Sequence, residues 1–243
     1  MNSNINQPKL PCKVEPFQWA GPNDPLFAET GLVHCASIPP QATAAQPAPL
    51  VVMVHGWAGD ESSMWIFKQT LPASAAIIAP RAPVSLDSGF AWFSYNGSRA
   101  APDRASLARG VNTLDRFIDS LPRHYPVDPD RLILMGFSQG AMTINAFVYA
   151  NPDRAIGVVS MAGAFPPVIN GEPYSNWLAG LPVFVAHGTR DETIPVESAR
   201  ETRDLYRALG ADVTYGEYPT GHKMHSQGLK DLKQWLAMFF VDA

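Results

Sequence analysis

Cysteine is scarce in this chain, which limits how it could be cross-linked or hold a metal. Its 243 residues include only two cysteines, Cys12 and Cys35. Two are too few for a disulfide framework, so we interpret both as free thiols. Neither lies in a CxxC spacing or in the sequence context of a catalytic thiol. Cysteine chemistry is therefore not expected to carry the function.

Long apolar runs are missing as well. No stretch of eighteen or more apolar residues occurs, so the sequence predicts no transmembrane helix. Residues 1–17 lack the apolar core that is typical of a secretory signal peptide. We therefore expect a cytoplasmic protein without stable membrane insertion.

An excess of positive charge is the third absence. The chain has 18 Lys and Arg against 22 Asp and Glu, a formal net charge of −4, and no run of clustered basic residues. This balance argues against a nucleic-acid partner and against an anionic membrane surface. A small-molecule partner is the remaining expectation, and the sequence leaves the oligomeric state open.

Apolar residues, in contrast, are plentiful. They make up 46% of the chain, and charged residues make up 16%, which is enough to build one sizeable core. The Pro-rich stretch 39–49 is interpreted as a surface loop, because too little chain precedes it to fold alone. We predict one domain over residues 1–243, in which residues 1–49 pack on the sheet or extend it.

Short apolar runs alternate with amphipathic segments along the rest of the chain. The runs predicted as strands are 50–55, 75–80, 131–138, 156–163, 181–188 and 212–218. The segments predicted as helices are 107–121, 141–151, 197–210 and 229–240. Such alternation favours an α/β fold with a mostly parallel central sheet, helices on both faces, and functional loops at the carboxyl ends of the strands.

A candidate nucleophile lies at one of these ends. Residues 136–140 read GFSQG and fit the pattern GxSxG between a predicted strand and a predicted helix, which is the context that a nucleophilic serine requires. Glycines flank Ser138 because a Cβ at either position would crowd the sharp turn. The following helix directs its positive N-terminal dipole at the oxyanion that forms. The alternative is a plain glycine-containing turn with an exposed serine.

The acid partner should follow the serine along the chain, because triads whose serine lies in a GxSxG turn between a strand and a helix run Ser, acid, His. The predicted strand 181–188 is followed by Asp191 and Glu192. The turn after the strand presents Asp191 first, so it is the predicted acid. Glu192 is the alternative.

The base should come last, and two histidines follow both acids. His222 comes directly after the last predicted strand and is preceded by Gly221, which lets the backbone turn the ring inward. His225 is the alternative base. We predict that His222 takes the Ser138 proton and that Asp191 fixes its tautomer.

Acyl transfer also needs N–H donors where negative charge develops. The backbone N–H of Gln139, directly after the nucleophile, is the first predicted donor. The second is the N–H of Trp57, in the loop that follows strand 50–55, although this segment could also be a plain strand-to-helix connection. Aromatic residues near the predicted catalytic loops are candidates for substrate binding, with ordinary core packing as the alternative. The candidates are Trp57, Trp65, Trp92 and Phe93.

Several motifs together resemble one family. HGWAGD, GFSQGA, HGTRDETIPVE and GHKMHSQGLKDLKQWL look like the phospholipase/carboxylesterase family, which includes bacterial carboxylesterases and acyl-protein thioesterases. The resemblance runs from about Leu50 to Val241. It implies an α/β-hydrolase fold with little or no cap, no metal and no cofactor. It also places Ser138, Asp191 and His222 at the triad positions and Trp57 and Gln139 at the oxyanion positions.

The chain departs from the family pattern at two places. Trp57-Ala58 stands where the family commonly has Leu-Gly, which puts the substrate range in question. Gln227 or Gly228 stands where the family usually has an acid, which leaves the triad prediction unchanged.

The sequence therefore predicts a serine carboxylesterase for short- to medium-chain acyl or aryl esters. The alternative enzyme is an acyl-protein thioesterase or lysophospholipase that acts on longer chains. A non-catalytic member of the fold that binds a ligand is the alternative from another class of protein.

Overall fold

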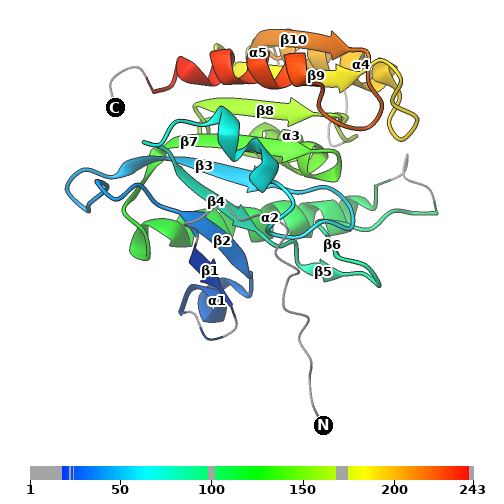
Figure 1. Cartoon of the computed structure of the whole chain (residues 1–243). Coiled ribbons are helices and arrows are strands. Elements are labelled where there is room, and N and C mark those ends of the chain that lie inside the picture. The colour runs from blue at the N-terminus through cyan, green and yellow to red at the C-terminus, as the bar shows by residue number, and fades with distance from the viewer. Residues whose placement is uncertain (1–17, 22, 24, 98–101, 168–174, 241–243) are drawn as a thin grey trace.

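The computed structural model describes residues 18–240 except for 22, 24, 98–101 and 168–174 (Figure 1). Cys12 and residues 1–17 lie outside the described residues. Cys35 is buried and is a free thiol. None of the described helices is both long and apolar enough to cross a bilayer.

An eight-stranded sheet forms the centre of the described structure, in the order β1-β2-β4-β3-β7-β8-β9-β10. The strands are β1 (Gln18–Ala20), β2 (His34–Ser37), β3 (Ala48–Val54), β4 (Ala76–Pro80), β7 (Val127–Phe137), β8 (Gly157–Met161), β9 (Pro182–Gly188) and β10 (Asp212–Tyr218). Neighbouring strands pair in parallel from β4 to β10. This arrangement confirms the predicted mostly parallel sheet.

The first two strands add an antiparallel edge that the sequence patterns did not reveal. β1 pairs with β2, and β2 pairs with β4, both antiparallel. The described part of residues 1–49 thus extends the sheet. A two-stranded hairpin of β5 (Val84–Ser85) and β6 (Phe90–Ala91) lies outside the sheet. These strands are too short to produce a readable period.

Helices cover both faces of the sheet (Figure 1). They are α1 (Pro25–Thr30), η1 (Trp65–Thr70), α2 (Arg104–Ser120), η2 (Leu121–Arg123), α3 (Gln139–Ala150), α4 (Val196–Ala208) and α5 (Ser226–Ala237). One core joins the sheet to α2, α3 and α4, and the other joins it to η1 and α5. The sheet thus lies between two layers.

Strand β3 shows why both faces need cover. Leu50, Val52 and Val54 face the first core, whereas Val51 and Met53 face the second, and all five are fully buried. Because successive side chains of a strand point to opposite faces, a run of apolar residues predicts a strand buried on both sides.

The predicted helices exist, with ends shifted by up to three residues. α2 begins at Arg104 because Asp103 caps it, its side chain accepting a hydrogen bond of 2.6 Å from the Ser106 N–H. α5 begins at Ser226 because the His225 side chain accepts from the Gln227 N–H. Caps of this kind lie outside the apolar period, so periodicity places the helix ends late.

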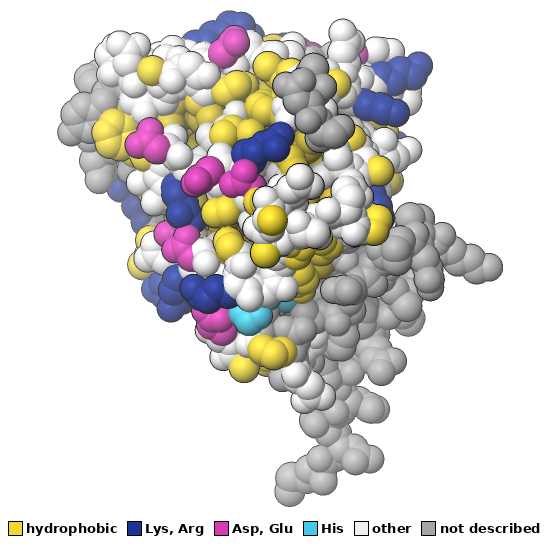
Figure 2. All heavy atoms as spheres, turned by 90° about the vertical axis from the view of Figure 1, so that its left-hand side faces the viewer, with side chains coloured by type: hydrophobic (Ala, Val, Ile, Leu, Met, Phe, Trp, Pro, Cys, Tyr) yellow, Lys and Arg dark blue, Asp and Glu magenta, His cyan; other side chains and the backbone are white. Residues whose placement is uncertain are grey.

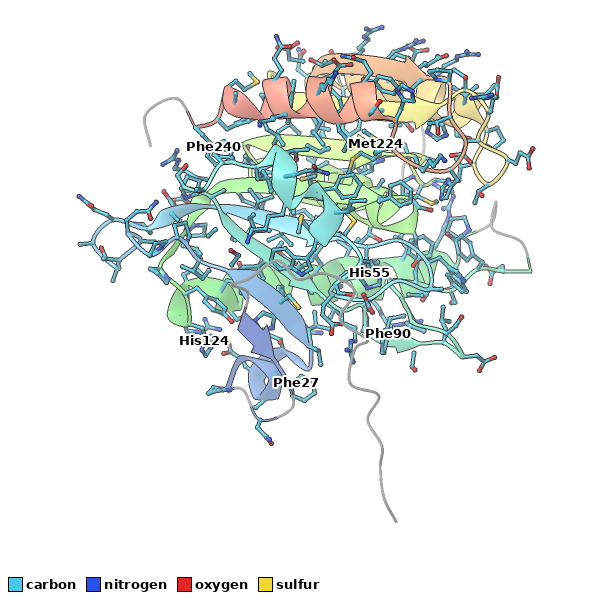
Figure 3. The ribbon with its side chains drawn as sticks, in the orientation of Figure 1. Phe27, His55, Phe90, His124, Met224 and Phe240 are labelled. Carbon is cyan, nitrogen blue, oxygen red and sulfur yellow. The ribbon has the colours of Figure 1, made fainter. Side chains whose placement is uncertain are left out.

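The amino and carboxyl ends of the parallel strands lie on opposite sides of the molecule. Figure 2 shows the face at their amino ends, where basic and acidic side chains lie close together, so its described residues form no continuous basic stripe. His55, Phe90 and Met224 lie toward the carboxyl ends, whereas His124 and Phe240 lie toward the amino ends (Figure 3). The candidate site is at the carboxyl ends, as expected for parallel α/β sheets.

Candidate active site

Ser138 occupies a strained turn between β7 and α3. Its backbone has φ 54° and ψ −118°, in the left-handed range that a residue with a Cβ rarely adopts. A Cβ added to Gly136 would lie 2.6 Å from the Gly140 backbone, and one added to Gly140 would lie 2.0 Å from the Val54 carbonyl oxygen. The two glycines are therefore required by close packing around the serine.

The structure brings the three predicted triad side chains together. The Ser138 hydroxyl lies 2.9 Å from His222 Nε2, and His222 Nδ1 lies 2.7 Å from Asp191 Oδ2. A carboxylate accepts, so Nδ1 carries the proton and Nε2 is free to accept from the serine. Ser138 and Asp191 are nearly buried, and the imidazole between them is partly open to solvent.

Asp191 is held firmly on its other side. Its Oδ1 accepts hydrogen bonds from the backbone N–H groups of Thr193, at 2.8 Å, and Ile194, at 3.0 Å. Its side chain is inaccessible to solvent, so the carboxylate has little freedom to turn away from His222. Glu192, the alternative acid, is exposed.

The ring of His225, the alternative base, is engaged in contacts with α5 and β10 and not with Ser138. Its Nδ1 accepts from the Gln227 N–H at 3.2 Å, which caps α5, and its ring stacks on Tyr218 with 6.1 Å between ring centroids. It is His222 that the structure places beside the serine.

The loop after β3 approaches the nucleophile closely. A Cβ added to Gly56 would lie 3.2 Å from the Ser138 Cβ, so the backbone that leads into Trp57 passes beside the serine. Gln139 is the first residue of α3, where helix N–H groups have no partner within the helix. Both predicted oxyanion donors are thus on segments next to Ser138.

The buried side chain of His55 holds this loop through two hydrogen bonds. Its Nδ1 donates to the Gly56 carbonyl at 2.7 Å, and its Nε2 accepts from the Ala82 N–H at 3.0 Å. Burial lowers the pKa of His55 from 6.5 to about 4, with the bond to Gly56 opposing that shift. The ring is therefore neutral at pH 7 and can both donate and accept.

An ion pair holds the far end of the same loop. Arg81, at the end of β4, makes two hydrogen bonds of 2.6 Å to the fully buried carboxylate of Glu61. The Arg81 guanidinium also lies 4.5 Å from the centroid of the Phe90 ring. The Phe90 N–H in turn donates to the Gly59 carbonyl at 2.9 Å. These contacts fix the loop against β4 and β6.

The Gln139 side chain has a role that sequence patterns did not reveal. It is buried, its Oε1 accepts from the Trp92 N–H at 2.8 Å, and its Nε2 donates to the Phe93 carbonyl at 2.9 Å. It thus ties the segment after β6 to the start of α3. A glutamine at a predicted helix start carried no signal of this contact.

A cavity of about 600 Å³ opens beside Ser138. It lies between η1 and the segment from His222 into α5, and its lining is mostly apolar. The lining residues other than Ser138 and His222 are Gly56, Trp57, Ala58, Gly59, Ser63, Met64, Ile66, Phe67, Phe137, Thr193, Lys223, Met224 and Leu229. Phe67 and Phe137 are in ring contact, with 6.5 Å between their centroids.

The aromatic candidates divide in two. Trp57 lines the cavity, whereas Trp65, Trp92 and Phe93 are not among its lining residues. Trp92 and Phe93 are fully buried, and Trp92 Nε1 donates to the His55 carbonyl at 3.0 Å. The prediction that Trp92 and Phe93 line the substrate site is therefore wrong, because both rings are buried in the core next to the loop after β3; for Trp65 it stays a prediction.

The apolar wall comes instead from residues that the sequence analysis did not propose as lining. Met64, Ile66 and Phe67 lie on or next to η1, and Met224 and Leu229 follow His222. Their position just after the predicted oxyanion loop and just after the predicted base was the available signal. Among the described residues, no three His, Cys, Asp or Glu side chains form a group suited to a metal ion.

Residues 34–240 match the profile of the phospholipase/carboxylesterase family. The chain belongs to this family. The match covers the elements that carry the serine, the acid and the base, and it confirms the resemblance on which the sequence analysis relied.

Named relatives are found among thioesterases. The chain is 29% identical over 223 residues to acyl-protein thioesterase 1 of Debaryomyces hansenii, covering 83% of this chain and 93% of that protein. It is 27% identical over 229 residues to acyl-protein thioesterase 1 of Candida albicans, covering 84% and 96%.

Solved structures show the same fold. The Bacillus cereus carboxylesterase superposes with a TM-score of 0.78 at 21% identity, covering 88% of this chain and 98% of that one. The Mesorhizobium loti carboxylesterase gives 0.74 at 20% identity with the same coverage. As a member of this family, the protein is a hydrolase that acts on esters.

Proposed function

We propose that this protein is a serine carboxylesterase that hydrolyses short- to medium-chain acyl or aryl esters through a covalent acyl-enzyme. One observation carries the proposal: the His222 ring lies between the Ser138 hydroxyl, at 2.9 Å, and the Asp191 carboxylate, at 2.7 Å. This is the arrangement in which an imidazole can take a serine proton while its other nitrogen stays hydrogen-bonded to an acid.

The proposed reaction has two halves. His222 removes the hydroxyl proton as Ser138 Oγ attacks the ester carbonyl, and the N–H groups of Trp57 and Gln139 stabilise the oxyanion. The imidazolium then returns the proton to the leaving alcohol, which departs and leaves the acyl group on Ser138. In the second half, His222 activates a water molecule, which releases the carboxylic acid and restores the serine.

The volume and the lining of the cavity favour a substrate with an apolar acyl or aryl group. Its volume of about 600 Å³ lies within the range of small-molecule sites, about 300–1,000 Å³. The side chains of Met64, Phe67, Phe137 and Met224 offer apolar surface next to Ser138. Burying methylene groups there contributes about 0.8 kcal/mol each, which favours medium chains over acetyl esters.

A thioesterase that acts on longer acyl chains is the second candidate. It is favoured by the relatives named acyl-protein thioesterase 1. The same serine, base and oxyanion donors would serve a thioester, because only the leaving group differs. The length of the acyl chain, and not the catalytic geometry, separates the two candidates.

Chain-length kinetics test the proposal. We expect kcat/KM for p-nitrophenyl esters to be highest between C4 and C8, and to fall for C12–C16 esters and for the matching acyl thioesters. Maximal turnover of C12–C16 thioesters would replace the first candidate by the second. A fluorophosphonate probe should label the wild type and not Ser138→Ala. Labelling that survives this substitution, or a wild type that is never labelled, would refute an acyl-enzyme on Ser138.

A further inference from the structure

A second imidazole contacts the carboxylate of Asp191. His187 is the penultimate residue of β9, and its side chain is inaccessible to solvent. Its Nε2 lies 2.9 Å from the Ile194 carbonyl oxygen and 3.4 Å from Asp191 Oδ2. This is the same carboxylate oxygen that accepts from His222 at 2.7 Å. His187 does not line the cavity beside Ser138.

The contacts determine where the proton of His187 lies. A carbonyl oxygen can only accept, so Nε2 carries the hydrogen and donates it to the Ile194 carbonyl, with Asp191 Oδ2 nearby at 3.4 Å. Nδ1 is buried, and the described residues offer it no hydrogen-bond partner. A second proton there would be a buried charge without an acceptor, and burial accordingly lowers the pKa of His187. The ring is a neutral N–H donor.

His187 holds the acid-bearing turn mainly through the carbonyl of Ile194, to which its N–H donates at 2.9 Å. The N–H of Ile194 in turn bonds Asp191 Oδ1 at 3.0 Å. The His187 ring also lies beside Oδ2, at 3.4 Å, so both oxygens of the carboxylate lie close to groups that one buried ring holds in place. The bond to the Ile194 carbonyl closes residues 188–194 into a rigid loop.

We propose that His187 is a positioning residue, which fixes the turn that presents the Asp191 carboxylate to His222 and places a neutral N–H dipole beside its negative charge. The proposal rests on the proposed esterase function and deepens the account of that same site. His187 touches neither the nucleophile nor the cavity, so it acts only through Asp191.

The charged groups around His187 determine in which direction the acidic limb of the pH profile should move when His187 is replaced. Asp191 lies on its own loop, His222 follows β10, and Glu217 pairs with His187 across the β9–β10 register. Glu217 is itself bound by Arg200 from α4, at 2.8 and 2.9 Å. Removing the His187 N–H leaves more charge on Asp191 Oδ2. That charge stabilises the His222 imidazolium and raises the pH at which the base becomes free.

The test compares two substitutions of nearly equal size. Gln reaches as far as the imidazole Nε2 and supplies an N–H, whereas Met fills the space without a donor. For His187→Met we expect kcat to fall about tenfold, since losing the bond to the Ile194 carbonyl loosens the turn that positions Asp191, with KM changed less than about twofold. The acidic limb of the kcat/KM profile should move up by about half a pH unit. His187→Gln should stay within about threefold of the wild type.

His34 supplies the matched control. It is another fully buried histidine, on β2, and its Nε2 lies 2.7 Å from the Tyr125 hydroxyl. β4 and β3 separate its strand from β7 in the sheet. His34→Met should lower stability without moving the acidic limb. To allow for partial unfolding, the pH profile is also measured as the rate constant of fluorophosphonate labelling, divided by the folded fraction determined at each pH.

The outcomes are distinct. A shifted limb in His187→Met with recovery in His187→Gln supports the positioning role. An active wild type whose limb and kcat are unchanged in His187→Met overturns that role and leaves the esterase proposal intact. Equal losses in Met and Gln with no shift of the limb also overturn it, since they indicate packing alone. A wild type that neither hydrolyses esters nor reacts with the probe overturns both proposals.

Discussion

The indole of Trp57 packs against the ring of Tyr95, with 5.3 Å between ring centroids and 53° between ring planes. Tyr95 in turn contacts the Phe93 ring at 5.1 Å. Trp57 lines the cavity beside Ser138, whereas Tyr95 and Phe93 are not among its lining residues. The indole thus joins the cavity wall to this cluster of rings.

Replacing Trp57 should change the preference for chain length. Trp57→Leu keeps the backbone N–H and removes the ring, so longer chains gain room toward Tyr95. We expect the ratio of kcat/KM for C12 over C4 esters to rise about tenfold, as for a change of a few methylenes in a pocket. Trp57→Phe, which keeps an aromatic ring, is the control. Identical chain-length profiles for the Leu variant and the wild type would refute this role.

The triad should behave as one unit. Ser138→Ala and His222→Ala should each lower kcat on the order of 10⁶-fold, with the double variant little worse, because each residue is useless without the other. Asp191→Asn should cost about 10⁴-fold. The neighbours Glu192 and His225 supply the controls, and Glu192→Gln and His225→Gln should stay within about twofold. A larger loss in a neighbour than in its triad counterpart would reassign the role.

The buried Glu61–Arg81 pair should matter for both stability and rate. Glu61→Gln leaves the largely buried guanidinium of Arg81 without its counter-charge, at a cost of about 3–5 kcal/mol in the free energy of unfolding. Because the pair fixes the loop that carries the proposed oxyanion donor Trp57, kcat should fall more than KM rises. Denaturant unfolding and steady-state kinetics measure the two effects.

The exposed pair of Arg203 and Asp204 is the control for that experiment. It has similar geometry at 2.7 Å, but Asp204 is 60% exposed, so solvent screens the pair and Asp204→Asn should change the free energy of unfolding far less than Glu61→Gln does. Equal effects of the two substitutions on the free energy of unfolding would show that the buried pair contributes no more to stability than an exposed pair does.

Stability should fall in mild acid because of His55. Its pKa is about 4 in the folded chain against an ordinary value of 6.5, so the unfolded chain binds the proton more readily. The contribution of the neutral His55 ring to the free energy of unfolding is fully present above pH 6.5 and is lost as the pH falls from 6.5 toward 4. Between pH 7 and pH 4.5 this amounts to a loss on the order of 2 kcal/mol.

Comparison with His55→Gln isolates this contribution. The variant has no proton to take up at this position, so its free energy of unfolding should depend less steeply on pH over the same interval. His187, whose pKa is also lowered, contributes in the same direction in both proteins. Parallel stability curves for the variant and the wild type would contradict the assignment to His55.

Much of the fold was predictable, because buried strands and amphipathic helices have distinct apolar periods. β3 and α2 are examples: an unbroken apolar run marks the first, and apolar positions three and four apart mark the second. The edge strands β1 and β2 were not predictable, since three or four residues cannot display a period. Their antiparallel pairing depends on a neighbouring strand, β4, that lies far along the chain.

By itself, the sequence determined the order of strands and helices and the candidate positions Ser138, Asp191 and His222. Local glycines and strand ends sufficed for that, because the parallel topology brings the carboxyl ends together. Only the tertiary structure decided that Trp92 and Phe93 are core, that η1 and α5 form the cavity wall, and that His187 contacts Asp191. The cavity wall and the bond from Trp92 to His55, which lies 37 residues away in the chain, join segments that are far apart in the sequence, and no local pattern records such contacts. His187 and Asp191 are only four residues apart, but the folded turn that brings their side chains together depends on the bond to the Ile194 carbonyl.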